Sequence, residues 1–255
     1  TKLATNKEPV ANDFNESLRV IIFDNYSQYN RYGQTTFNIQ TNNGGMYIEG
    51  KPSKPGNQAT FFSFEAFWKR PEFSVWNLNH EYVHYLDGRF SKYSGFGHFP
   101  SHLVWWSEGL AEYISKGDDN KRAFKLLIEN ERKDWPSLAD IFGTTYADGS
   151  KRVYQWSYMA IRFLYEHYPE QFRQLKTYLK TDYFDGYKGL LDELSEKHQQ
   201  EFVAWMKTHQ VIAQETKDTE KVENKPIKRK IYRYLYRDYL QPKSLPINKR
   251  HNHNI

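Results

Sequence analysis

Two histidines four residues apart, with a glutamate directly after the first, are the residues of this sequence whose spacing points most clearly to chemistry. They are His80, Glu81 and His84. On a helix, residues four apart lie on one face, so both imidazoles can bind a single cation. Glu81 lies one position further round the helix, where it can act as a general base for an attacking water without binding the metal itself. The pentapeptide therefore predicts a hydrolytic zinc site.

The residues around the histidines have the spacing of an amphipathic helix. Apolar side chains recur at steps of three and four residues: Val75, Leu78, Tyr82, Val83 and Leu86. This pattern is typical of a helix half buried in a core. Asp87 and Gly88 then predict the end of the helix, because glycine tolerates the left-handed conformation of a C-cap. The alternative is two surface histidines on an ordinary helix, with no metal between them.

The composition limits what can hold the metal. The chain has 255 residues, enough for one large domain or two lobes, and no cysteine. A metal must therefore be bound by histidine, carboxylate or carbonyl groups, and an extracellular protein without disulfides would need another stabiliser such as calcium. No apolar run approaches the roughly 20 residues of a membrane span. No signal peptide precedes Thr1, and a start at Thr is what we expect of an excised domain or a processed chain.

The net charge of +5 belongs to the C-terminal end of the chain. Eleven of the 36 Lys and Arg but only four of the 31 Asp and Glu follow residue 216, which leaves 25 basic against 27 acidic residues before it. A nucleic-acid enzyme would place its basic groove on the catalytic body. We therefore expect neither nucleic acid nor a membrane as a partner. Aromatic residues make up 17% of the chain, which favours core packing over aromatic subsites for an extended ligand.

Strand patterns come first along the chain and helix patterns follow. We expect strands at 18–23, 35–39, 46–49 and 60–64, with a turn at 41–45. After the metal helix, helical patterns cover 104–115, 121–131, 136–142, 153–168, 169–179, 187–196 and 201–208. This order predicts a two-lobed α+β metallopeptidase domain over residues 1–214, with a sheet-containing lobe to about 89 and a mainly helical lobe from about 90. Residues 215–255 are expected to form a linker and a basic, Tyr-rich extension, either helix or strand.

A catalytic zinc site needs a third protein ligand and one open position. The three-histidine class of metallopeptidases has glycine three residues, and histidine six residues, after the second histidine of the pentapeptide. This chain has Asp87 and Phe90 there, which excludes that class. His98 and His102 are again four apart, but Pro100 between them disfavours the helix that would bring them together. We expect these two histidines in a loop or a substrate wall.

The segment 105–113 offers better ligands. Glu108 and Glu112 share one helix face, and the small Gly109 and Ala111 allow that helix to approach the metal helix closely. Two carboxylates on a helix rich in Trp, Leu and Tyr need a partner if their face is buried, and a dication would supply it. We predict Glu108 as the third ligand and Glu112 as the acceptor for the free N–H of a ligating histidine. Two solvent-facing glutamates, or exchanged roles, are the alternatives.

Taken together, residues 80–90 (HEYVHYLDGRF) and 105–113 (WWSEGLAEY) resemble the catalytic domain of the bacterial collagenases, most closely the vibrio type, within the gluzincin metallopeptidases. The resemblance runs from about residue 43 to the helices past Tyr158. In gluzincins the glutamate before the glycine of the second helix is the third zinc ligand, which matches Glu108. The later acidic residue lies behind the ligands, which matches Glu112. The resemblance thus implies a zincin-like N-terminal lobe.

The resemblance also gives roles to residues that spacing alone leaves without one. Gly44 and Gly45 are similar to the double glycine at the head of a substrate-binding edge strand. Glu49 is similar to a glutamate that helps to hold a calcium ion near the zinc helix, with carbonyls around Gly88 completing that site. Tyr154 is our candidate for the donor that stabilises the oxyanion.

A secreted zinc endopeptidase that cleaves collagen or gelatin is the function implied by the resemblance, with Glu81 as general base and Zn2+ and Ca2+ as cofactors. Collagenases of this type also carry an upstream activator domain, to which nothing here is similar. Without that domain, we expect cleavage of peptides and gelatin to exceed attack on triple-helical collagen. Two alternatives stay open. One is a gluzincin aminopeptidase or oligopeptidase in which Glu49 binds the free α-amine, and the other is a non-catalytic zinc-stabilised binding module, against which the intact Glu81 speaks.

Overall fold

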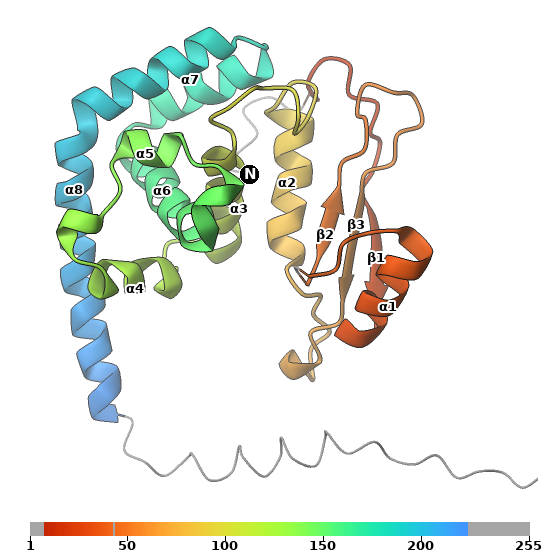
Figure 1. Ribbon diagram of the computed structural model, residues 1–255, viewed down its shortest axis with the longest axis horizontal. Coiled ribbons are helices and arrows are strands. Elements are labelled where there is room, and N and C mark those ends of the chain that lie inside the picture. Colours follow the sequence, from red (N-terminus) through yellow and green to blue (C-terminus); the bar gives the residue numbers. More distant parts are fainter. Residues whose placement is uncertain (1–7, 43, 224–255) are drawn as a thin grey trace, which may run out of the picture. The chain divides into compact units, whose positions relative to one another are not determined.

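The computed structural model of the chain describes residues 8–42 and 44–223 (Figure 1). The described residues up to 213 form one compact unit, and the end of the last helix belongs to a second. The basic, Tyr-rich extension expected at the C-terminus, from residue 224 on, lies outside the described residues. The described part has the mixed α+β composition that the sequence predicts, with a small mixed sheet followed by helices.

A three-stranded sheet forms the first layer of the unit. Its strands are β1 (Arg19–Phe23), β2 (Met46–Ile48) and β3 (Thr60–Phe64), in the order β1-β3-β2. β1 runs parallel to β3 and β2 runs antiparallel to it. All five positions of β3 are buried, which explains its almost uninterrupted apolar sequence. β2 lies at an edge of the sheet, on the side of the metal helix (Figure 1).

The strand expected at 35–39 is wrong, because residues 26–37 form helix α1 (Tyr26–Phe37). The Asn25 side chain caps the helix by accepting a hydrogen bond from the Gln28 N–H at 3.0 Å. Tyr29 and Gly33, four residues apart, are the buried positions of the helix. The Tyr29 ring packs on Phe64 of β3 with 5.8 Å between centroids. Packing of this face on the sheet thus outweighs the local alternation that suggested a strand.

The helix expected to bind the metal is α2 (Leu78–Phe90), and it lies between the sheet and the helices that follow (Figure 1). It continues past Gly88, so the expected stop at that glycine is wrong. The helix ends instead at Ser91, whose N–H bonds to the Asp87 carbonyl at 2.9 Å. Gly88 is buried, and a Cβ there would collide with the carboxylate of Glu49. The glycine is explained by this close approach rather than by a C-cap.

The helical lobe begins with α3 (Val104–Lys116). The helices that follow are α4 (Lys121–Glu129), α5 (Leu138–Phe142), α6 (Ser157–His167), α7 (Pro169–Lys180) and α8 (Phe184–Glu223). Within the described residues, four short elements accompany these helices: the 3₁₀ turns Phe67–Lys69, Arg132–Asp134 and Tyr146–Asp148, and the π-helical segment Lys151–Trp156. The two helices expected at 187–196 and 201–208 are one continuous helix, α8, which also covers the first part of the expected linker. Residues 197–200 are polar, but they contain no glycine or proline that would break a helix.

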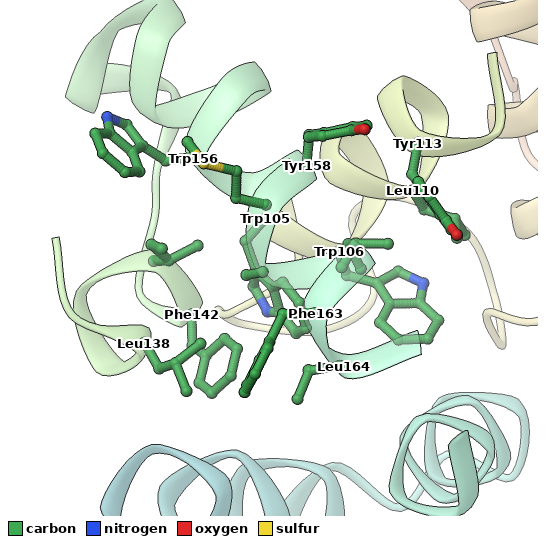
Figure 2. Close-up of a cluster of buried hydrophobic side chains, with 14 of the residues drawn as sticks. Trp105, Trp106, Leu110, Tyr113, Leu138, Phe142, Trp156, Tyr158, Phe163 and Leu164 are labelled. Atoms are coloured by element: carbon green, nitrogen blue, oxygen red, sulfur yellow. The ribbon is translucent and has the colours of Figure 1, made fainter. Parts of the chain in front are cut away.

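A core of aromatic and aliphatic side chains holds the helices of this lobe together (Figure 2). Trp105 and Trp106 of α3 are fully buried, and Trp105 packs on Phe142 of α5 with 4.6 Å between ring centroids. Gly109 allows α3 to touch α6, since a Cβ on it would lie 2.6 Å from the carbonyl oxygen of Ser157. These contacts fix the rotation of α3, and with it the direction of its two glutamates.

Candidate metal centre and catalytic cleft

Three side chains from α2 and α3 converge on one point. His80 and His84 lie one turn apart on α2, and Glu108 faces them from α3. The Glu108 Oε2 atom lies 3.1 Å from His80 Nε2 and 3.5 Å from His84 Nε2. One ligand atom from each residue falls within 4.8 Å of the other two, and all three residues are buried. The structure thus brings together the three predicted ligands in an arrangement that could hold a metal ion.

The electrostatics of these residues reflect two imidazoles around a buried carboxylate. Burial disfavours the charged imidazolium, but hydrogen bonds to Glu108 and Glu112 outweigh burial and raise the pKa of His80 to about 9. Burial likewise disfavours ionised Glu108, yet His84 and His80 hold its pKa well below the usual range of a glutamic acid. The site therefore already favours a cation in contact with Glu108.

Glu112 lies behind the three converging residues, one turn further along α3. Its Oε1 atom is 3.3 Å from His80 Nδ1, the ring nitrogen that faces away from Glu108. Its Oε2 atom accepts a hydrogen bond from the side-chain amide of Asn120 at 3.1 Å. This placement matches the predicted role of Glu112 as a partner of a ligating histidine. Asn120 also caps α4, and nothing in the sequence alone links it to the site.

Glu81 is held next to the converging residues by the residue before α2. The Asn77 side-chain amide donates to Glu81 Oε1 at 2.8 Å. Asn77 has a left-handed backbone with φ of 57°, a conformation that asparagine adopts more readily than most residues. Asn77 could not be selected from the sequence, because its contact with Glu81 depends on this backbone conformation. Its hydrogen bond leaves the other carboxylate oxygen of Glu81 available to a substrate or water.

An open cleft of about 1080 Å³ lies over these residues. The residues that line it include Gly45, Met46, Tyr47, Glu49, Trp76, His80, Glu81, His84, Glu108, Glu112, Tyr146 and Tyr154. The Tyr154 ring packs edge-on against His80 with 6.0 Å between centroids. Burial and the nearby Glu108 raise the pKa of Tyr154 to about 12, so its hydroxyl keeps its proton at neutral pH. It lies on the π-helical segment, an irregularity often found at functional sites.

Tyr146 is a site residue that the sequence did not reveal. Its hydroxyl donates to Glu108 Oε1 at 2.7 Å, on the carboxylate oxygen turned away from the histidines. Burial and the charge of Glu108 raise the pKa of Tyr146. The residue lies 38 positions after Glu108 in a short turn, so neither periodicity nor spacing connects the two. The hydrogen bond orients the carboxylate toward His80 and His84.

Glu49 comes directly after β2 and lies against the end of α2. Its Oε2 atom accepts a hydrogen bond from the Phe96 N–H at 2.7 Å, whereas its buried Oε1 atom has no hydrogen-bond partner among the described residues. Gly88 and Gly95 both face this carboxylate, and a Cβ on either would collide with it. A buried carboxylate oxygen without a donor fits a cation site. The structure thus brings Glu49 and Gly88 together, as the sequence comparison suggested.

Gly44 and Gly45 lie at the head of the edge strand β2. Gly44 has φ of 75°, and a Cβ there would lie 2.9 Å from the Trp76 indole nitrogen. Gly45 is part of the cleft lining. The absence of a side chain lets Trp76 pack against Gly44 and the Phe61 ring pack against Gly45, where a Cβ would lie 3.2 Å from that ring. A substrate-binding role for this edge stays a prediction.

His98 and His102 lie away from the metal centre. His98 Nε2 is 2.5 Å from Asp182 Oδ1, and His102 Nδ1 is 2.6 Å from Ser101 Oγ. Neither residue lines the cleft. The structure therefore places both in the loop between α2 and α3, as expected, but gives them no part in the substrate wall.

Comparison with known proteins agrees with this geometry. A family model described as Collagenase matches residues 1–205. The chain belongs to the collagenase family. It is 41% identical over 208 residues to a microbial collagenase of Vibrio alginolyticus and 34% identical over 212 residues to one of Vibrio parahaemolyticus. Collagenase ColA of Bacillus cereus is 30% identical over 199 residues.

These matches cover 81%, 82% and 74% of this collagenase-family chain, but only 25%, 25% and 20% of the three relatives. The chain therefore spans about a quarter of the length of its curated vibrio relatives. Among the described residues, no helix combines the length and the apolar character needed to cross a bilayer.

A buried ion pair at the end of α2 contacts α3 in this collagenase-family chain, beyond the candidate metal centre. Lys92 Nζ lies 3.1 Å from Asp87 Oδ2, and each side chain is only 1% exposed. Lys92 also donates to Ser107 Oγ at 2.9 Å, and the Trp106 indole donates to Asp87 Oδ1 at 3.1 Å. The ammonium lies 4.0 Å from the centroid of the Phe96 ring. Asp87 lies three residues after His84, and Ser107 lies directly before Glu108. The ion pair and its hydrogen bonds therefore hold α2 and α3 together next to the candidate ligands.

Proposed function

We propose that this chain is a zinc-dependent endopeptidase domain that cleaves collagen-type and gelatin-type polypeptides. The observation that carries the proposal is the convergence of His80, His84 and Glu108 beside Glu81 in an open cleft. Two imidazoles and one carboxylate are a ligand set typical of catalytic zinc. The relatives named microbial collagenases support the substrate class.

His80, His84 and Glu108 would hold the zinc ion, and Glu112 and Tyr146 would orient His80 and Glu108 from behind. When bound, zinc would polarise the scissile carbonyl and lower the pKa of a water molecule toward about 7. Glu81 takes the proton of the attacking water and returns it to the leaving amine. The hydrogen bond from Asn77 orients Glu81 for both transfers.

The substrate would lie extended along β2, with its backbone against Gly44 and Gly45. Tyr154, which keeps its proton at neutral pH, would donate to the oxyanion that forms on the scissile carbonyl. Secretion of the protein is part of this proposal, because collagen is an extracellular substrate; with no cysteine for disulfides, calcium would serve as the stabiliser there.

A calcium ion at Glu49 is proposed as a structural cofactor. The support is the buried Glu49 oxygen without a hydrogen-bond donor and its position against Gly88 and Gly95. Calcium prefers oxygen ligands, and backbone carbonyls near Gly88 would complete its shell. Such an ion would fix the end of α2 relative to β2. Glu49→Gln should therefore abolish the stabilisation that added calcium gives to thermal unfolding, while it leaves bound zinc unchanged.

An aminopeptidase of the gluzincin class is the second candidate, and one observation favours it. Glu49 also lines the cleft, where its carboxylate could bind a free α-amine instead of calcium. Peptides with a blocked N-terminus distinguish the two functions. Cleavage of blocked peptides supports the endopeptidase, whereas loss of cleavage on blocking would refute it in favour of the aminopeptidase.

The catalytic role of Glu81 is tested with Glu81→Gln and a blocked peptide substrate. We expect the variant to keep about one zinc per chain and to lose activity by about 10²- to 10⁴-fold, because the general base is removed and the ligands are not. Glu129→Gln, on the surface of α4, is the matched control and should match the wild type. Turnover by Glu81→Gln at the wild-type rate would refute the mechanism. If both proteins bind zinc but the wild type cleaves no peptide, a non-catalytic binding module would be favoured.

The ligand assignment is tested by elemental analysis of Glu108→Ala and Glu112→Ala. Glu108→Ala should lose zinc, since it removes a ligand. Glu112→Ala should retain zinc with a lower affinity, by about 10- to 100-fold, because only an outer contact is lost. Loss of zinc in Glu112→Ala alone would reverse the two roles.

A further inference from the structure

A hairpin between β3 and α2 projects at the rim of the cleft. Its base is an antiparallel bridge between Glu65 and Val75. Two backbone hydrogen bonds close it further, from Ala66 N–H to the Ser74 carbonyl at 2.7 Å and from Trp76 N–H to the Phe64 carbonyl at 3.0 Å. Residues 67–73 form its tip. Because both ends continue into the sheet and the metal helix, the tip has a defined position relative to the catalytic residues.

The tip of this hairpin exposes three large aromatic side chains. Phe67 is 54% exposed, Trp68 51% and Phe73 69%. Phe73 is the most exposed large apolar side chain among the described residues. The Trp68 ring lies 5.3 Å from Phe67 and 5.3 Å from Trp76, measured between centroids. Clustered exposed aromatics of this kind are unfavourable in water and mark binding surfaces more often than scattered ones do.

The aromatic tip is continuous with the catalytic cleft. Phe73 and Trp76 line the same cleft as His80 and Glu81. Trp76 also lies against Gly44 at the head of the edge strand. An extended chain bound along β2 would therefore lie close to Trp76, which joins the tip to the head of the edge strand.

The chemistry of a proline-rich chain explains why a strand edge alone would bind it poorly. Proline has no backbone N–H, so each proline removes a hydrogen bond that an added strand could donate to β2. Proline-rich chains instead adopt the polyproline II conformation, which aromatic-lined grooves recognise through contact with the proline rings. Such contacts require exposed aromatic rings rather than an unpaired strand edge.

We propose that the tip formed by Phe67, Trp68 and Phe73 is a second substrate-binding site for proline-rich segments that flank the cleaved bond. The site deepens the function proposed above and rests on it. It supplies binding where the prolines of the substrate prevent pairing with β2. It also makes the tip a determinant of specificity, since substrates without proline gain less from it.

The test uses two blocked peptides of equal length with the same central sequence, one with proline-rich flanks and one with alanine in place of those prolines. The kcat/KM ratio of the two peptides is measured for the wild type, Phe73→Ala and Phe73→Trp. We expect Phe73→Ala to lower the preference for the proline-rich peptide by about 3- to 10-fold, mainly through KM, because the contact is made equally in the ground and transition states. Phe73→Trp should retain the preference. Phe14→Ala, an equally simple truncation of a 47% exposed phenylalanine outside the cleft, is the control.

Two results would overturn the proposal. One is cleavage of both peptides by Phe73→Ala with the wild-type preference, which would leave the endopeptidase function intact. The other comes from a tryptophan-fluorescence titration with the proline-rich peptide, carried out on Glu81→Gln and on Glu81→Gln combined with Phe73→Ala. Because this titration needs no turnover, it applies even if the wild type cleaves neither peptide. Equal affinity of the two proteins would refute the site.

Discussion

The buried pair of Lys92 and Asp87 gives the sharpest prediction about stability. Replacing Lys92 by methionine keeps much of the side-chain volume but removes the charge that faces Asp87 at 3.1 Å. The Asp87 carboxylate would then remain 1% exposed, with the Trp106 indole still donating to its Oδ1 atom at 3.1 Å. Breaking a buried ion pair by removing one partner typically costs about 3–5 kcal/mol. Lys176 also interacts electrostatically with Asp87, so we expect the lower end, about 3 kcal/mol.

The assay is urea unfolding with a chelator present, so that bound metal does not contribute to the measured free energy. Thermal unfolding should show a decrease in Tm of roughly 6–12 °C. Lys188→Met is the matched control, because Lys188 pairs with Asp192 at 2.9 Å on the surface, with side chains 44% and 60% exposed. Its effect should stay below about 1 kcal/mol.

A double variant separates loss of the charge from loss of packing. Lys92→Met combined with Asp87→Asn removes the uncompensated charge and should recover at least about 1 kcal/mol relative to Lys92→Met alone. The reasoning is refuted if Lys92→Met lies within about 1 kcal/mol of the wild type, or if the double variant is no more stable than the single one.

The remaining predictions concern the candidate metal centre and the packing around it. Gly109→Ala should destabilise the protein by about 2 kcal/mol or more, because the new Cβ would lie 2.6 Å from a carbonyl oxygen of α6. The control is Gly189→Ala, in open space on α8, which should be neutral or stabilising by up to about 1 kcal/mol. Chemical unfolding measures the free energy of unfolding of both variants. Tyr146→Phe should weaken zinc binding by about 10- to 100-fold in chelator competition, since Glu108 loses its orienting hydrogen bond; unchanged affinity would contradict that role. The raised pKa of His80, about 9 against 6.5, stabilises the metal-free fold below pH 6.5, and this contribution is lost as the pH rises through 9. Because zinc binds the neutral imidazole, the affinity for zinc should rise about tenfold per pH unit between pH 7 and 9, and binding should release one proton. Calorimetry in two buffers measures both quantities. A zinc affinity that does not change with pH would contradict the prediction.

The parts of the fold that the sequence predicts well are those set by local pattern. β3 lies where its apolar run predicts it, and α3 begins at the predicted residue. The convergence of His80 and His84 follows from a four-residue spacing that any helix would enforce. The placement of Glu108 opposite them follows from the small residues beside it, of which Gly109 is the one in contact with α6.

The parts that the sequence does not predict depend on contacts between distant segments. α1 was mistaken for a strand because the burial of Tyr29 and Gly33 against the sheet is not a local property. The burial of Lys92 could not be foreseen, since a lysine is normally exposed unless a partner such as Asp87 neutralises it. Tyr146 reaches Glu108 only through the path of the chain between α5 and α6. Sequence pattern thus predicts the candidate metal ligands, whereas the residues that contact these ligands from behind become evident only in the tertiary structure.

The shortness of β2 has a consequence for self-association. The edge strand of a sheet can pair with the same edge of another molecule, which is a common route to aggregation. β2 has only three residues and is preceded by Gly44, whose φ of 75° departs from a strand conformation. A second copy could therefore add only a segment of roughly 10 Å, too short to hold two folded proteins together. If β2 binds substrate as proposed, a peptide that a metal ion and the cleft walls also hold needs no longer ladder, so the short edge would admit substrate while it discourages dimers.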